Sequence, residues 1–101
     1  MKKISATELN RRPGAAIDAA LREGHIAITK WRQLAALLAR EAPALVAGLE
    51  WQTATATQLV TDPTILTNTH NNTGIYQITR QGTIVAYLLP RMYLDELGLE
   101  L

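Results

Sequence analysis

The sequence predicts an α+β fold built from two tandem units of about fifty residues, each with a strand, two helices, a β-hairpin and a short helix. Two observations predict it. Residues 1–50 and 51–101 align without a gap, and both halves carry helix starts, turns and strand-like runs in the same order. Twelve aligned pairs are identical, against on the order of four expected by chance in a chain rich in Ala, Leu and Thr. The pairs are Ala6/Ala56, Thr7/Thr57, Leu9/Leu59, Pro13/Pro63, Gly24/Gly74, Ile28/Ile78, Thr29/Thr79, Ala36/Ala86, Leu38/Leu88, Gly48/Gly98, Leu49/Leu99 and Glu50/Glu100.

We call residues 1–50 the first repeat and residues 51–101 the second repeat. Because a lone unit of this size buries little core, we expect the two to pack together as one compact unit.

Each repeat opens with a short extended segment, residues 2–4 or 52–54, that leads into a helix. Ser5 with Glu8, and Thr55 with Gln58, have the spacing of a capping box, in which two side chains satisfy free amide groups of the first helical turn. A first helix is therefore predicted after Ser5 and after Thr55.

Proline marks the start of a second helix in each repeat. Pro13 and Pro63 suit the first helical turn, where no amide hydrogen is needed, and Asp62 is a good N-cap. The first repeat continues as an alanine-rich helix that stops at Gly24. Residues 67–72 are poor helix formers, so the corresponding helix of the second repeat should be shorter.

Two strand-like runs follow in each repeat. Residues 25–30 and 75–80 alternate apolar and polar side chains, and residues 81–83 form a turn into the β-rich run 84–89. Residues 31–38 have a helical propensity, but their alignment with 81–88 favours a strand. Short closing helices are expected near residues 41–49 and 91–97.

Composition excludes several classes of protein. The chain has no cysteine and therefore no disulfide or thiolate zinc site. It shows no signal peptide at the N-terminus and no apolar run near the roughly 18 residues of a membrane span, so we expect a cytoplasmic location without membrane contact. His25 and His70 stand alone, so neither a metal nor another cofactor is expected. Without a nucleophile–base pair or a glycine-rich phosphate loop, we do not expect an enzyme.

The order of these motifs resembles the N-terminal domain of Phd/YefM-type antitoxins. That family follows roughly Ile-Ser-x-x-Glu-Leu, Gly, Ile-Thr-Arg, Gly and Val-Ala-x-Leu-x-Pro, with a Tyr and a Leu in the closing helix. The first repeat matches at residues 4–9, Gly24 and residues 28–30, and the second repeat at Gly74, residues 78–80, Gly82, residues 85–90, Tyr93 and Leu97.

The resemblance implies a dimeric repressor that binds double-stranded operator DNA and controls the genes that encode it. Two tandem Phd/YefM-like units would then form either a single-chain pseudo-dimer or a swapped dimer of two chains, and the sequence leaves both open. Antitoxins of the family usually continue into a tail that neutralises a cognate toxin, whereas this sequence ends at Leu101, directly after the second repeat. The alternative function, which the acidic second repeat favours, is a protein-binding antitoxin or inhibitor with little affinity for DNA.

Charge is divided unequally between the repeats. The first repeat has eight cationic and five anionic side chains, a balance of +3, and the second has two and four, a balance of −2. An anionic partner should therefore prefer the first repeat.

The resemblance implies that contacts with DNA lie after the capping box and near the hairpin, and the residue types there and at the chain start suit phosphates and base edges. The residues predicted to contact DNA are Lys2, Lys3, Thr7, Asn10, Arg11, Arg12, Lys30, Arg32 and Arg80. The competing interpretation is an ordinary solvated basic face. The second repeat has Val60, Thr61 and Asp62 where the first has Asn10, Arg11 and Arg12, so contact with DNA should be lopsided. Trp31 and Trp51 are expected to pack between the two repeats, with partner anchoring as the alternative.

Overall fold

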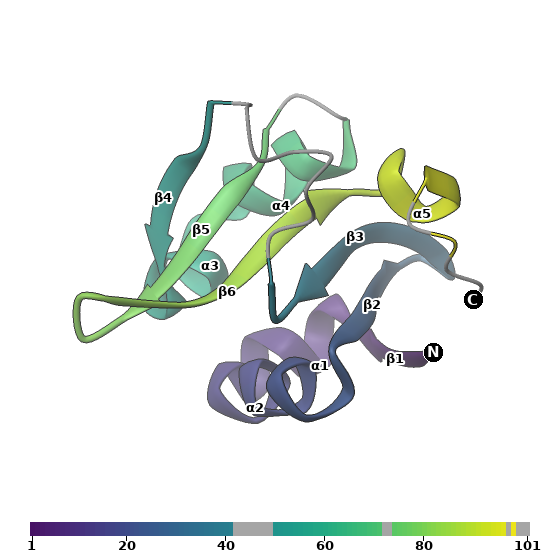
Figure 1. Cartoon of the computed structure of the whole chain (residues 1–101). Coiled ribbons are helices and arrows are strands. Elements are labelled where there is room, and N and C mark those ends of the chain that lie inside the picture. Colours follow the sequence, from purple (N-terminus) through teal and green to yellow (C-terminus); the bar gives the residue numbers. More distant parts are fainter. Residues whose placement is uncertain (42–49, 72–73, 97, 99–101) are drawn as a thin grey trace.

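A computed structural model describes residues 1–41, 50–71, 74–96 and 98 of the chain. Its framework is one six-stranded mixed sheet in the order β1-β2-β3-β6-β5-β4 (Figure 1). The first repeat contributes β1 (Lys2–Ser5), α1 (Ala6–Arg11), α2 (Pro13–Glu23), β2 (His25–Lys30) and β3 (Gln33–Ala39). The second contributes β4 (Gln52–Thr55), α3 (Ala56–Thr61), α4 (Pro63–His70), β5 (Tyr76–Arg80), β6 (Thr83–Pro90) and α5 (Tyr93–Glu96). The α+β class predicted from the sequence is confirmed.

The helix starts follow the predicted capping chemistry. The Ser5 hydroxyl accepts a hydrogen bond from the Glu8 amide at 3.1 Å, and Thr55 and Gln58 form a complete capping box. Pro13 begins α2, and α4 begins at proline behind the Asp62 N-cap. α4 has 8 residues against 11 in α2, as the poor helix formers of the second repeat predicted.

The strand assignments also agree with the structure. Residues 33–39 form β3, so the duplicate rather than the local helical propensity was the better guide. The closing helix predicted near residues 91–97 is α5, which is shorter than expected. The closing helix predicted near residues 41–49 falls mostly on residues 42–49, which lie outside the described part of the chain.

The two repeats meet through β3 and β6 at the centre of the sheet. These strands pair antiparallel with Leu38 opposite Leu88, residues that are fifty positions apart. A position of the duplicated unit therefore faces its own copy, which is the arrangement of a two-fold, isologous interface. This pairing lies within a single chain (Figure 1).

The register of each half repeats with the same offset. In the parallel pair β1–β2, Lys2 lies opposite Ile26, and in β4–β5 Gln52 lies opposite Tyr76. Both hairpins carry an irregularity at the same place, after Ile28 and after Ile78. The duplication seen in the sequence is thus repeated in the backbone pairing.

The main core lies between the sheet and helices α1–α4. Its buried strand residues all belong to one face of the sheet, and each of the four helices contributes buried side chains, among them Leu9, Ile17, Leu59 and Ile65. A smaller cluster on the other face consists of Leu37, Ala39, Ile75 and Leu89, with Trp51, Tyr93 and Leu94 packed against it. The central strands are therefore buried on both faces, whereas the edge strands, the outer sides of the helices and the hairpin turns carry exposed side chains.

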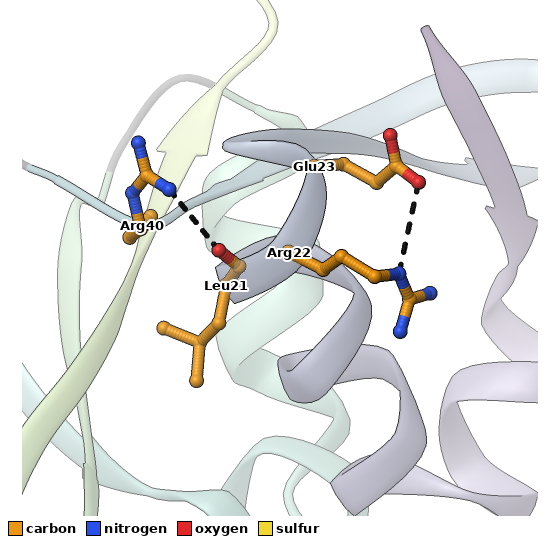
Figure 2. A network of polar contacts seen from close by, with 4 residues as sticks. All are labelled: Leu21, Arg22, Glu23 and Arg40. Carbon is orange, nitrogen blue, oxygen red and sulfur yellow. Dashed lines mark hydrogen bonds and ion pairs between the residues drawn. The ribbon is translucent and has the colours of Figure 1, made fainter.

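Arg40 fixes the C-terminal end of α2 to the end of β3. Its guanidinium donates a hydrogen bond to the Leu21 carbonyl at 3.2 Å (Figure 2). Its backbone amide donates to the Gly24 carbonyl at 2.9 Å. A cation here satisfies a carbonyl of the last helical turn and interacts favourably with the helix dipole. Arg22 lies nearby and pairs with Glu23 at 3.8 Å (Figure 2).

Candidate nucleic-acid interface

Helix α1 carries three of the residues predicted to contact DNA. Leu9 is 1% exposed and anchors the helix in the main core. Thr7, Asn10 and Arg11 lie on the exposed side of the same helix. The buried leucine and the Ser5 cap therefore present these polar side chains outward from a fixed helix.

A groove beside α1 brings three predicted cations together. Lys2, Arg11 and Arg12 line it, together with Glu8 and apolar residues of β1 and α2, and its volume is about 340 Å³. All three cations are exposed, and they come from a strand, a helix end and the residue between two helices. The groove is therefore mainly cationic, with the Glu8 carboxylate as its single anionic side chain.

A second groove lies on the other side of α1, between the two repeats. Thr7, Asn10, Lys30 and Trp31 line it from the first repeat, and apolar residues of α3 and α4, among them Val60, line it from the second. Its volume is about 280 Å³. Six of the nine predicted contact residues thus gather around α1 and the two grooves that flank it.

The other three predicted residues lie apart from this group. Lys3 follows Lys2 on the edge strand β1, so its side chain points to the opposite face of the sheet. Arg32 is exposed in the turn between β2 and β3. Arg80 reaches across to α2 of the first repeat, where its Nη1 lies 3.5 Å from Asp18 Oδ1. Arg80 is thus a link between the repeats.

The cations of the first repeat fall into two groups. Arg22 and Arg40, at the C-terminal end of α2, form ion pairs with Glu23 and Glu41, both at 3.8 Å. Among the described residues, no ion pair involves any of the predicted contact cations of the first repeat. These unpaired cations are Lys2, Lys3, Arg11, Arg12, Lys30 and Arg32. Four of them, Lys2, Arg11, Arg12 and Lys30, line the two grooves beside α1.

The equivalent surface of the second repeat has a different chemistry. Val60 is half-buried, and the Thr61 hydroxyl donates to the Thr57 carbonyl at 2.9 Å. Asp62 accepts hydrogen bonds from the hydroxyl of Thr64 at 2.6 Å and from its amide at 3.0 Å, and these bonds lower the pKa of the Asp62 carboxyl. The second repeat therefore has a negatively charged side chain, Asp62, at the position that corresponds to the positively charged Arg12 of the first repeat.

The prediction that Trp31 packs between the repeats was wrong. The residue is 85% exposed at the tip of the β2–β3 hairpin, with the Lys30 ammonium 4.8 Å from its ring centroid. The physical reason is the two-residue turn, in which no neighbouring strand covers the side chain. Trp51 does pack as predicted: it contacts Tyr87 edge-on at 5.2 Å and adjoins a cluster formed by both repeats.

Sequence reasoning passed over Trp31 as a surface residue, although a signal was present. Aligned with the second repeat, Trp31 and Arg32 correspond to Gln81 and Gly82, the turn of the duplicate hairpin. A residue in a two-residue turn has no sheet neighbour to cover it. The alignment that identified β3 therefore also contained the signal for the exposure of Trp31, although the prediction did not use it.

Comparisons with protein-family models, curated proteins and solved structures found no match. In the described part of the chain, no helix is long and apolar enough to cross a membrane. Within those same residues, no three His, Asp or Glu side chains come together in a group that could hold a metal ion.

Proposed function

We propose that the protein is a DNA-binding transcriptional repressor of the antitoxin type, which contacts double-stranded operator DNA mainly through the first repeat. The observation that carries the proposal is the gathering of unpaired cations with Thr7 and Asn10 around α1. Phosphate contacts position a protein on DNA, and amide or hydroxyl side chains beside them read base edges. Both types of group are present on one surface here.

The roles of these side chains follow from their chemistry. Arg11, Arg12 and Lys2 line one groove and suit phosphate oxygens, since a guanidinium or ammonium neutralises charge on the backbone. The Asn10 amide, in the second groove, suits the N6 and N7 edge of adenine. In this proposal Asn10 contributes sequence preference, and the cations contribute affinity.

The pairing of β3 with β6 favours a single-chain pseudo-dimer of two Phd/YefM-like units. Equivalent residues already meet across the centre of the sheet, so this interface needs no second chain. The two halves of this pseudo-dimer differ in charge, because Arg12 is matched by Asp62. We therefore expect an operator without a strong palindrome, in contrast to symmetric dimers.

A gel-shift titration with the DNA upstream of its own gene tests the proposal. Replacing Arg11 and Arg12 with Ala should weaken binding and reduce the slope of log K against log salt by about two, because about 0.9 counterion is released per phosphate contact. Arg22→Ala is the matched control, since it also removes one exposed cation but one paired with Glu23. Equal losses in the control and in single Arg11→Ala or Arg12→Ala variants would reject this surface as the contact site.

The second candidate is a protein-binding antitoxin or inhibitor. The acidic residue at position 62 and the half-buried Val60 favour it, because this half of the pseudo-dimer lacks the groups that bind phosphate. Co-expression with a toxin encoded beside it, followed by co-purification, tests this function. Formation of a toxin complex by the Arg11→Ala/Arg12→Ala variant would show that toxin binding is independent of the cationic surface, whereas no complex and no rescue of growth would count against this function.

A further inference from the structure

The turn between β2 and β3 differs from its duplicate in a way that the fold does not require. Trp31 and Arg32 both have positive φ, 52° and 64°, as do Gln81 and Gly82 in the β5–β6 turn, 54° and 81°. Such two-residue hairpin turns favour Asn, Asp and Gly. The second repeat follows this preference with Gly82, whereas the first repeat places a bulky aromatic and an arginine in the left-handed region.

Trp and Arg in this backbone conformation are strained, and no packing compensates for it at the tryptophan. The indole is 85% exposed, so it contributes little to the core. Strained backbone that persists without a packing reason is typical of binding sites. The unfavourable residues of this turn therefore suggest a role in binding.

The surroundings of Trp31 indicate what it binds. Lys30 and Arg32 flank it in sequence, and the Lys30 ammonium lies over its ring at 4.8 Å. Trp31 also lines the groove that contains Thr7 and Asn10, so the indole is continuous with the surface proposed to contact DNA. An aromatic ring between two cations suits a polyanion that also offers flat, stacking groups, which is the chemistry of a nucleic acid.

We propose that Trp31 is a stacking wedge: its indole packs against a base pair of the duplex while Lys30 and Arg32 bind the adjacent phosphates. This inference rests on the proposed DNA-binding function. In the free protein the Lys30 ammonium covers the ring, and exposed cation–π contacts are weak enough to be exchanged for a phosphate. The freed indole then enters a base step, as apolar side chains of other proteins do when they kink DNA.

Trp31→Gln is the appropriate variant, because Gln81 occupies the equivalent position with nearly the same φ. The substitution removes the indole and introduces a residue type that the equivalent β5–β6 turn already contains. We expect affinity for the upstream duplex to fall about tenfold, as for loss of one aromatic–base contact. The salt dependence should not change, because no phosphate contact is lost. Arg32→Gly is the comparison, since it should reduce the slope of log K against log salt by about one.

Fluorescence measures the position of the indole directly. In a Trp51→Phe variant, Trp31 is the sole tryptophan, since the chain contains two. Addition of the duplex should quench its emission and protect it from acrylamide. Fluorescence energy transfer between dyes on the duplex ends should also report a bend with the wild type and a smaller bend with Trp31→Gln.

The outcomes separate this inference from the proposed function. Binding that is unaffected by Trp31→Gln, or an indole in the complex that acrylamide quenches as readily as in the free protein, overturns the wedge and leaves DNA binding intact. A wild-type protein that binds no duplex overturns both. A tenfold loss at constant salt slope, together with a protected indole, supports the wedge.

Discussion

Truncation of Leu38 should destabilise both repeats at once. Leu38 and Leu88 are fully buried, lie opposite each other in the centre of the sheet and belong to the same core cluster. If the two repeats form one cooperative unit, a cavity at this contact weakens the interface that joins them. Leu38→Ala should therefore lower the free energy of unfolding of the whole chain.

The magnitude follows from the burial of Leu38. Leu→Ala at a fully buried position costs about 2–5 kcal/mol, and β3 is held by a strand on each side, so the cavity can collapse only partly. We expect a loss of about 3 kcal/mol, a large share of the roughly 5–15 kcal/mol by which such domains are stable. The melting temperature should fall by roughly 12–24 °C. Because the side chains of Leu38 and Leu88 are neighbours, the double variant should deviate from additivity by at least about 0.5 kcal/mol.

Urea unfolding followed by circular dichroism and by tryptophan fluorescence measures these changes. Ile84→Ala is the control, because Ile84 lies on β6 but is 43% exposed, and its truncation should cost less than about 1 kcal/mol. Two separate transitions, or a loss below about 1 kcal/mol for Leu38→Ala, would refute the idea that the repeats fold as one unit around this contact.

Three further substitutions test local features. Arg32→Gly should stabilise the fold by up to about 1 kcal/mol in thermal unfolding, because it removes a side chain from the left-handed region at φ 64°; destabilisation would show that Arg32 has a structural role. Asp18→Asn breaks the partly exposed pair with Arg80 and should cost about 0.2–1 kcal/mol in urea unfolding, less at high salt, whereas an unaltered urea midpoint at low salt would show that the pair adds no stability. The pKa of the Asp62 carboxyl in the folded protein lies below its usual value of 3.8. The ionised Asp62 side chain that caps α4 therefore stabilises the fold above about pH 3.8, and this stabilisation is lost as the pH falls through the pKa of the folded state. Asp62→Asn should remove this acid sensitivity, measured as the shift in urea midpoint between about pH 5 and pH 3; an equal shift in wild type and variant would contradict it.

The helices and strands could be predicted because their signals are local. Ser5 and Thr55 each start a helix through one hydrogen bond to an amide three residues on, and both bonds are present. Pro13 marks the start of a helix because proline has no amide hydrogen and a fixed φ, both of which suit the first helical position. Residues 31–38 were ambiguous locally, and only the comparison with the second repeat identified β3, because pairing with β2 and β6 outweighs helical propensity.

The arrangement of the repeats and of the charges could not be predicted in the same way. The local sequence around Leu38 contains no signal for pairing with Leu88, because that pairing forms only in the complete sheet. The sequence also gives Arg12 and Arg40 the same charge, whereas the structure pairs Arg40 with the end of α2 and leaves Arg12 in an open groove. Sequence alone therefore predicted a basic first repeat but not which of its cations are available.

The salt dependence of binding to the upstream duplex tests the proposed function most directly. Five cations of the first repeat have no ion pair in the described part of the chain and, unlike Lys3, do not point to the opposite face of the sheet: Lys2, Arg11, Arg12, Lys30 and Arg32. If each binds one phosphate, log K should fall linearly with log salt with a slope of about −4.5. Arg11→Ala/Arg12→Ala should change this slope to about −2.7, and Arg22→Ala should leave it unchanged. Absence of binding at low salt, or a slope that these substitutions do not alter, would contradict the assignment of this surface to DNA.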